Sequence, residues 1–266
     1  MIKTREGCDI IGRFCFTVDD NIRFLKEITE NNFRSLFDHP YLAMYRRLHE
    51  EFDLKIQLNL FYRMENFDLS QMSDEYRDEW RENADWLKLS FHSDRENVNP
   101  YKHSKYEEVF ADCRRVNEQI LRFASDKSLA NTTTVHYCQT TEEGLRALAD
   151  NGIRGLLGLF GDDERPSTSY AIDFATAEEI RKGNSVRLGG ITFASLDIVL
   201  NCFSEEQILL TLQKMTNRED LRVMIHEQYF YSDYKRYQPE FEAKLRATFS
   251  FLKSKGYFSV FFENMI

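Results

Sequence analysis

Proline and glycine are scarce in this chain, which has only 4 Pro and 11 Gly among 266 residues. Few positions can therefore serve as flexible linkers, and no segment shows an internal repeat or low complexity. Apolar residues make up 42% of the chain, and 22 Phe and 13 Tyr supply large side chains for a core. This composition excludes an intrinsically disordered protein and predicts a single globular domain over residues 1–266.

Excess positive charge is also missing. The 35 Lys and Arg are outnumbered by 44 Asp and Glu, which gives a net charge of −9. A surface that binds nucleic acid non-specifically needs clustered basic residues. The basic pairs Arg46-Arg47 and Arg114-Arg115 are typical of exposed helix faces instead. We therefore expect no nucleic-acid partner.

Paired cysteines and long apolar runs are lacking as well. The five cysteines are widely spaced and include no C-x-x-C pair, which excludes a disulfide framework and a zinc site built from thiolates. Residues 1–12 are polar and of mixed charge, unlike a signal peptide, and no later run has the apolar length of a membrane span. We therefore expect reduced cysteines, no membrane partner and a cytoplasmic protein.

Short β-prone runs alternate with longer amphipathic runs along the chain. Patterns typical of strands occupy residues 13–18, 54–62, 86–91, 132–135, 155–160, 191–194, 221–225 and 258–262. Patterns typical of helices occupy residues 22–31, 41–52, 73–85, 105–124, 140–150, 174–182, 205–216 and 239–255. The second strand alternates apolar and polar residues and is expected to be half buried. This order predicts an α/β fold of the (β/α)7–8 barrel-like type, a distorted TIM-type barrel of parallel strands.

Five residues that can bind metal or transfer protons stand where predicted strands end: Asp19, Asp20, His92, His136 and His226. In parallel α/β barrels the loops after the strands converge on one face, where binding and catalytic groups gather. Each residue alone has an ordinary explanation, since an Asp-Asp-Asn sequence also suits a solvated turn. However, three of the six histidines stand at strand ends, and the set as a whole predicts a functional site.

Further candidates lie close to these positions in the sequence. Glu96 follows His92 by four residues and could be another metal ligand. Glu227 follows His226 and could raise the pKa of that imidazole so that it acts as a proton donor. Asp197 follows another strand, where it either orients His226 or faces water. An aromatic group suits either sugar stacking or simple packing; its members are Tyr229, Phe230, Tyr231, Tyr234 and Tyr237.

In this order the residues resemble the motifs of the polysaccharide deacetylase homology domain, in the glycoside hydrolase/deacetylase superfamily. The T-F-D-D motif of that family corresponds to residues 17–20 (TVDD), and its H-x-x-x-H motif corresponds to residues 92–96 (HSDRE), without the second histidine. Its R-x-P-Y motif corresponds to residues 135–138 (VHYC), without the arginine, and its final L-x-H motif to residues 224–226 (MIH). The resemblance covers most of the chain, and each motif is degenerate.

Carried over position by position, the resemblance implies a role for each strand-end residue. Asp19 would be the general base, Asp20 and His92 metal ligands, and His226 the general acid. Either Glu96 or His136 would supply the third ligand. The resemblance also implies a divalent metal as cofactor, zinc above all, and a small-molecule or oligosaccharide substrate as partner.

We therefore predict a metal-dependent hydrolase that removes N- or O-acyl groups, such as acetyl, from a carbohydrate or a related amide. One alternative is a catalytically silent member of the same fold that binds a glycan or a protein partner. The other is a metal-free glycosidase that uses paired carboxylates, such as Asp20 with Glu96 or Glu227.

Overall fold

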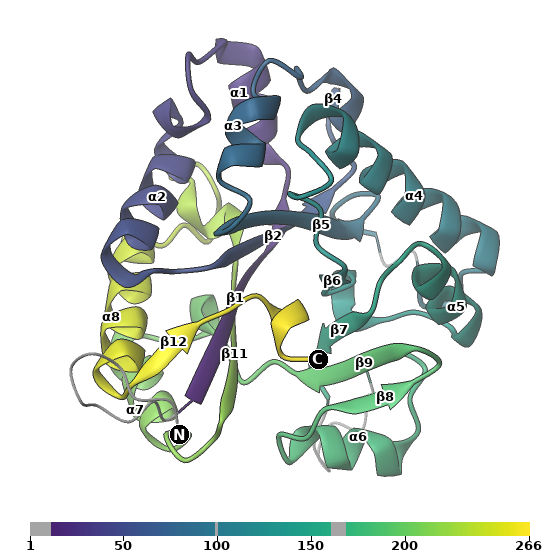
Figure 1. Ribbon diagram of the computed structural model, residues 1–266, viewed down its shortest axis with the longest axis vertical. Helices are drawn as coiled ribbons and strands as arrows, with labels where there is room; N and C mark the ends of the chain where they lie inside the picture. The colour runs from purple at the N-terminus through teal and green to yellow at the C-terminus, as the bar shows by residue number, and fades with distance from the viewer. Residues whose placement is uncertain (1–11, 99–100, 161–168) are drawn as a thin grey trace.

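The computed structural model describes residues 12–98, 101–160 and 169–266 of the chain, and its strands form two main sheets (Figure 1). The larger sheet has the order β10-β11-β1-β2-β5, and β12 also pairs with the start of β1. The smaller sheet has the order β6-β7-β9-β8. The strands of the larger sheet are β1 (Gly12–Asn21), β2 (Ile56–Phe61), β5 (Leu87–Ser93), β10 (Ile198–Val199), β11 (Asp220–His226) and β12 (Tyr257–Ser259). Those of the smaller sheet are β6 (Thr132–Thr133), β7 (Gly155–Gly158), β8 (Val186–Leu188) and β9 (Ile191–Ser195).

Every strand pair of the larger sheet is parallel, and only the β8–β9 pair of the smaller sheet is antiparallel. The predicted α/β class with parallel strands is therefore confirmed. A single parallel bridge between Leu89 and Leu129 links the two sheets on one side. On the other side, β9 leads almost directly into β10 along the chain. The ladder of the described strands is interrupted at these places, so the distorted barrel-like fold consists of two linked sheets.

Helices cover the outer faces of the sheets (Figure 1). Their apolar residues recur at the spacing of one helix face, as in α2, where Tyr41, Tyr45 and Leu48 are all fully buried. In the same way Phe249 of α8 packs against Phe14 and Phe16 of β1, with ring centroids 5.8 and 5.0 Å apart. The helices are α1 (Arg23–Asn31), α2 (Pro40–Phe52), α3 (Arg77–Glu82), α4 (Tyr106–Phe123), α5 (Glu142–Asp150), α6 (Phe174–Arg181), α7 (Glu205–Gln213) and α8 (Phe241–Ser254).

The alternation of side chains along β1 separates two cores. Phe14, Phe16 and Val18 belong to the large core beneath the helices. Cys15 belongs to a second, smaller apolar cluster, and Thr17 and Asp19 follow it on the same face of the strand because strand side chains alternate with a period of two. The other buried members of the smaller cluster are Leu157, Ala194, Leu196, Val199, Met224 and Phe262.

The C-terminal segment contributes to this second cluster. The predicted final strand over residues 258–262 is instead β12 followed by a 3-10 helix, Phe262–Asn264. Figure 1 shows this segment turning in between the two sheets. It is fastened there by the Lys88–Glu263 ion pair at 2.5 Å and by the hydrogen bond from Arg13 to the carbonyl of Asn264 at 3.0 Å.

Strand β2 departs from the prediction in a way that matters for the site. All six of its residues are buried, so the expectation of a half-buried strand is wrong. Its polar residues Gln57 and Asn59 are almost completely excluded from solvent. They lie on the same side of the sheet as Asp19, because Asn59 donates a hydrogen bond to Asp19. The polar residues of this alternating strand therefore face the interior of the protein and not water.

Short elements were not all anticipated. The hairpin of β3 (Arg63–Met64) and β4 (Phe67–Asp68) lies directly after β2 and carries Arg63 and Glu65. The helix expected over residues 73–85 is limited to α3.

Within the described part of the chain, no helix combines the length and apolar character needed to cross a membrane.

Candidate metal and catalytic centre

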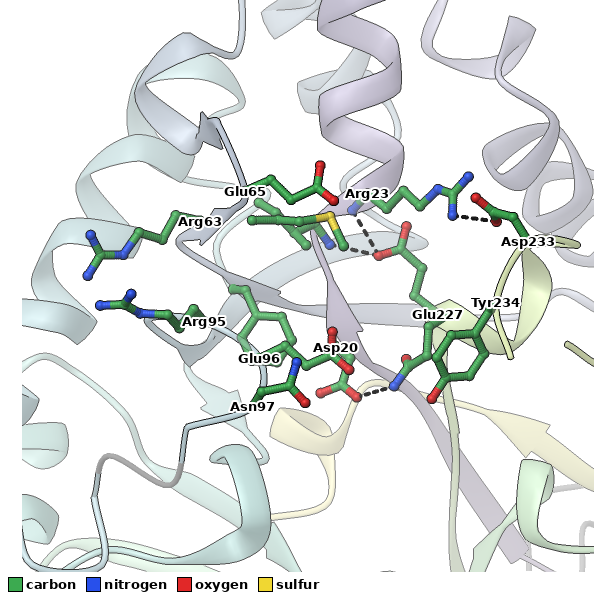
Figure 2. Close-up of a pocket in the computed structure, with 14 residues that line it drawn as sticks. Asp20, Arg23, Arg63, Glu65, Arg95, Glu96, Asn97, Glu227, Asp233 and Tyr234 are labelled. Atoms are coloured by element: carbon green, nitrogen blue, oxygen red, sulfur yellow. Dashed lines mark hydrogen bonds and ion pairs between the residues drawn. The ribbon is translucent and has the colours of Figure 1, made fainter. Parts of the chain in front are cut away.

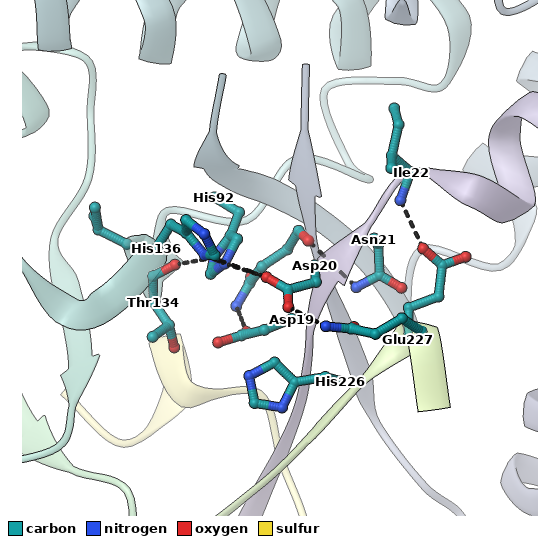
Figure 3. A network of polar contacts seen from close by, with 12 residues as sticks. Asp19, Asp20, Asn21, Ile22, His92, Thr134, His136, His226 and Glu227 are labelled. Atoms are coloured by element: carbon teal, nitrogen blue, oxygen red, sulfur yellow. Dashed lines mark hydrogen bonds and ion pairs between the residues drawn. The ribbon is translucent and has the colours of Figure 1, made fainter. Parts of the chain in front are cut away.

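Three buried side chains from three different strand ends converge on one point (Figure 3). Oδ1 of Asp20 lies 3.0 Å from Nε2 of His92 and 3.3 Å from Nδ1 of His136, and the two ring nitrogens are 3.2 Å apart. The structure thus brings His136, and not Glu96, into contact with Asp20 and His92. Glu96 lies on the wall of the adjoining cavity, outside this group of three.

A local change of backbone conformation turns Asp20 into the same space as Asp19. Asp20 has φ of 63°, in the left-handed region that Asp tolerates better than most residues. The pairing of β1 with β2 shifts register between Val18 and Asn21, around this residue. The strand alternation is therefore broken at Asp20, and two consecutive carboxylates can serve one site.

Neighbouring groups determine which ring nitrogen of His92 faces Asp20. Its Nδ1–H donates to the carbonyl of Thr134 at 2.5 Å, so Nε2 is the nitrogen that faces Asp20. Gln228 donates to the second oxygen of Asp20 at 2.7 Å. Asp20 and His92 are thereby held in place by partners outside the group of three.

The donor set fits a divalent metal ion. Zinc bonds of 2.0–2.1 Å to nitrogen in tetrahedral geometry place neighbouring ligand atoms roughly 3.3 Å apart, close to the separations of 3.0–3.3 Å seen among Asp20, His92 and His136. A carboxylate and two imidazoles suit an ion of intermediate softness. Nε2 of His136 is buried without a hydrogen-bond partner among the described residues, so the polar contacts of this ring are those of Nδ1 with Asp20 and His92.

Electrostatics within the group favour a charged carboxylate. Burial disfavours the charge on Asp20, but hydrogen bonds from His136 and His92 hold the pKa of this carboxyl well below its usual range. Burial lowers the pKa of His136. Burial also opposes protonation of His92, but the nearby Asp19 and Asp20 outweigh it and raise the pKa of His92.

Asp19 lies beside this group and is almost completely buried, with 1% of its surface exposed. Its Oδ1 accepts a hydrogen bond from Nδ2 of Asn59 at 2.6 Å. Burial raises the pKa of Asp19, against the opposing effects of His92, His226 and Asn59. The second oxygen of Asp19 is therefore the one available for proton transfer.

A chain of buried amides fixes the direction of that hydrogen bond. Nε2 of Gln57 donates at 2.8 Å both to the backbone carbonyl of Thr132 and to Oδ1 of Asn59. Because the carbonyl of Thr132 can only accept, this end of Gln57 must be its NH2 group. Asn59 must then present its own NH2 group to Asp19. Asn59 was not among the residues predicted from the sequence. The signal that could have identified it is the alternation in β2, where polar residues lie between buried apolar ones.

His226 approaches Asp19 from the opposite side, at the end of β11 (Figure 3). Its Nδ1–H donates to Oδ1 of Asn201 at 2.8 Å, and the same oxygen accepts the backbone N–H of His226 at 3.2 Å. This leaves Nε2 of His226 as the nitrogen available for proton transfer. Asp197 does not orient His226, because it forms ion pairs with Arg218 and with the buried Arg222.

Glu227 has a structural task at the start of α1. Its two carboxylate oxygens accept the backbone N–H groups of Ile22, Arg23 and Phe24 at 2.7, 3.1 and 2.8 Å, and the hydroxyl of Tyr231 at 2.8 Å. These N–H groups belong to the first turn of a helix, where they have no partner within the helix. Glu227 therefore caps the helix that follows Asp20. With both oxygens engaged, it is a poor candidate for the paired carboxylates of a glycosidase.

We expect the stability of the protein to depend on pH through Glu227. Burial raises the pKa of this carboxyl from 4.5 to about 7, so the folded chain binds a proton more tightly than the unfolded chain. The resulting stabilisation is complete below pH 4.5 and is lost as the pH rises through about 7, a change of about 3 kcal/mol. Urea unfolding of wild type and Glu227→Gln across this range should show the difference between them shrinking by this amount toward high pH. A constant difference would contradict it.

The aromatic residues after His226 divide into two groups. Tyr229 packs against Tyr234 with ring centroids 5.4 Å apart, close to the ring of His226 at 6.2 Å. Phe230 and Tyr231 instead pack against the buried Tyr41 of α2. Only the first group stands near the site.

A cavity of about 390 Å³ opens beside Asp20 (Figure 2). Tyr234 lies on one side of Asp20, and Arg63 and Arg95 lie on the other. Glu96, Asn97 and Gln228 also line it. The cavity therefore offers an aromatic ring and charged side chains next to the group of three.

No family sequence model matches the chain, and no curated protein sequence matches it. Among solved structures, a 4-alpha-glucanotransferase from Thermococcus litoralis superposes with a TM-score of 0.60 at 15% identity over 95% of this chain. This chain spans 40% of that protein's length.

Two further solved structures match over most of both chains. One is a family 4 acetyl xylan esterase from Clostridium thermocellum in complex with a cobalt ion, with a TM-score of 0.52 and 11% identity over 95% of this chain and 89% of that one. The other is a protein from Mycobacterium smegmatis described as a polysaccharide deacetylase, with a TM-score of 0.53 and 10% identity over 96% and 88%. The chain has the fold of the polysaccharide deacetylases. The resemblance in the sequence motifs is thereby confirmed at the level of the fold.

The candidate site differs from the deacetylase motifs at two positions. The second histidine of the H-x-x-x-H motif is replaced by Glu96, and His136 enters the group from the end of the next parallel strand. The arginine of the R-x-P-Y motif is replaced by Val135. The site thus departs from the deacetylase pattern at two places while keeping Asp19, Asp20 and His92.

Proposed function

We propose that this protein is a metal-dependent hydrolase that removes an acetyl or similar acyl group from an amine or hydroxyl of a carbohydrate. The observation that carries the proposal is the buried convergence of one Asp20 oxygen with one nitrogen each of His92 and His136. Asp19 and His226 lie next to each other, close to Asp20 (Figure 3), as expected for residues paired across β1 and β11. The resemblance of the motifs to those of deacetylases supports the choice of substrate class.

Asp20, His92 and His136 would hold the ion, and zinc is the ion we propose. A divalent ion there would supply Lewis acidity, which polarises a carbonyl oxygen and makes a water molecule more acidic. The protein keeps this place dry, since His92 and Asp19 are at most 2% exposed. Low exposure strengthens every electrostatic interaction within the site.

The chain's own residues would carry the proton transfers. Asp19, held through Oδ1 by Asn59, would accept a proton from the attacking water at its other oxygen. His226, held through Nδ1 by Asn201, would in its protonated form donate from Nε2 to the departing amine or alcohol. The two residues would thus act as the base and the acid of the same reaction.

Two measurements on purified protein test this proposal together. Elemental analysis after incubation with zinc should find about one ion per chain, and the loaded protein should release acetate from acetylated xylan or chitin oligosaccharides. Removal of the ion by a chelator should abolish the acetate release. A protein that takes up no divalent ion would overturn the proposal.

The alternative activities give different results. A catalytically silent protein would bind the ion and an acetylated oligosaccharide but release no acetate, and Asp19→Ala would leave that binding unchanged. A glycosidase would release reducing sugar without any metal. Measuring acetate and reducing ends in the same samples separates the three activities.

A further inference from the structure

The wall of the cavity away from Tyr234 carries two arginines from different elements. Arg63 belongs to the β3–β4 hairpin, and Arg95 follows β5 three residues after His92. Figure 2 shows their guanidinium groups next to each other and directed away from Asp20. Both side chains line the cavity, although about half of each is exposed, 42% for Arg63 and 51% for Arg95.

One buried carboxylate holds these like charges together. Oδ2 of Asp94 accepts hydrogen bonds from Nε and one terminal nitrogen of Arg63 at 3.0 and 2.7 Å, and from Nε of Arg95 at 2.9 Å. A third guanidinium, that of Arg115 on α4, lies 3.7 Å from Oδ1 of the same residue. Asp94 itself is 8% exposed. The guanidinium groups of these arginines are therefore held in position by the protein itself.

The charges around the arginines do not cancel. Asp94 and Asp112 face the three arginines Arg63, Arg95 and Arg115, so one positive charge is in excess. This excess occurs in a chain whose net charge is −9. Glu96 also lines this cavity, and burial and the charge of Asp20 raise its pKa.

The other charged groups that line the cavity have partners of their own. Arg23 pairs with Asp233 at 2.7 Å and with Glu27 at 2.8 Å. Glu65 pairs with Lys26 at 2.6 Å. The negative charges of Glu65 and Asp233 are therefore balanced by Lys26 and Arg23 and not by Arg63 or Arg95.

We propose that Arg63 and Arg95 form a subsite for an anionic group of the substrate, a carboxylate or a phosphate. This inference rests on the proposed function, because it takes the cavity beside Asp20 as the place where the acylated sugar binds. Guanidinium groups bind carboxylates and phosphates through paired hydrogen bonds. Since the two groups point away from Asp20, the anion lies on a part of the substrate distant from the acyl group. The substrate class is an acidic acylated saccharide, whose sugar ring Tyr234 can stack against.

Binding of matched acidic and neutral ligands tests the subsite without requiring hydrolysis. Hyaluronan tetrasaccharide and chitin tetrasaccharide have the same length and both carry N-acetyl groups, but only the first carries carboxylates. N-Acetylglucosamine 6-phosphate and N-acetylglucosamine form the corresponding pair for phosphate. Calorimetry at low salt should give about tenfold tighter binding for the acidic member of at least one pair, and the pair that shows it identifies the anion.

Variants of the subsite and a matched control complete the experiment. Arg95→Gln and Arg63→Gln should each remove most of the preference for the acidic ligand. Arg114→Gln should not, since Arg114 pairs with Glu118 on the exposed surface of α4. Thermal unfolding checks that each variant folds. Arg95→Gln should disturb the fold less than Arg63→Gln, because Arg95 makes fewer hydrogen bonds to Asp94.

The outcomes separate the subsite from the proposed activity. The subsite is overturned if wild type binds acidic and neutral ligands alike, or if the preference survives both substitutions. Acetate release from a neutral substrate would in that case leave the hydrolase proposal intact. Conversely, an arginine-dependent preference in a protein that releases no acetate would support the subsite and contradict the hydrolase.

Discussion

Replacing His136 with glutamine should weaken the binding of zinc at least about 100-fold, a loss beyond what disturbing a residue behind a ligand causes. The reason is geometric: Nδ1 of His136 lies 3.2–3.3 Å from the other two donor atoms. The amide of glutamine reaches the position of Nε2 and not that of Nδ1. Glu96→Gln should retain the ion, because Glu96 lies outside the group. Competition with a chromophoric chelator measures both affinities.

A second substitution at the same position sharpens this prediction. The shorter side chain of His136→Asn places an amide oxygen close to the position of Nδ1, so it should bind zinc more tightly than His136→Gln does. If the asparagine and glutamine variants are equally weak, His136 acts through general packing and not through Nδ1. If instead Glu96→Gln loses the ion while His136→Gln keeps it, Glu96 is the third ligand.

The proximity of residues at strand ends was the part of the candidate site that the sequence predicted well. Parallel strands bring their carboxyl ends to one edge, so residues that end successive β-type runs meet in space even when far apart in the chain. Asp20, His92 and His136 are separated from one another by 44 to 116 positions in the chain, yet their donor atoms lie within 4.8 Å of one another. The periodic pattern was sufficient because it fixed both the strands and their direction.

Residues that orient the candidate acid and base were not predictable in the same way. Asn59 lies in the middle of an alternating strand, and Asn201 lies in a 3-10 helix, Leu200–Cys202. Whether a polar side chain on a strand faces water or an enclosed interior depends on what packs against that face, which a single sequence does not contain. The role of Glu227 as a helix cap was hidden for a related reason, since its partners lie some 200 positions away.

The choice between Glu96 and His136 could not be made from spacing alone. The H-x-x-x-H spacing places the last residue on the same local segment as His92, and Glu96 occupies that position. In the structure Asp94 of this segment forms ion pairs with Arg63 and Arg95, and Glu96 lines the cavity. The segment after β5 thus contributes to the cavity wall, and the adjacent strand end supplies His136.

Asp19→Asn should lower the turnover number for acetate release about 1,000-fold and leave zinc binding nearly unchanged. General base catalysis contributes typically 10²–10⁴-fold, and an amide cannot accept the proton at pH 7. Asparagine keeps the size of the side chain and an oxygen to accept the hydrogen bond from Asn59. Steady-state kinetics together with metal analysis of the same preparation measures both quantities. A variant with near wild-type turnover would exclude Asp19 as the base.

The role of Asn59 follows from the same argument and can be isolated with a double-mutant cycle. Asn59→Leu should lower turnover about 10- to 100-fold without changing KM, because the lost hydrogen bond frees the carboxylate of Asp19 from its orientation. Combined with Asp19→Asn it should add little, since Asn59 acts through a base that is already absent. Fully additive losses would mean that Asn59 supports the fold of β2 independently of Asp19. The non-additive result would tie the buried chain of amides from Thr132 through Gln57 to proton transfer at Asp19.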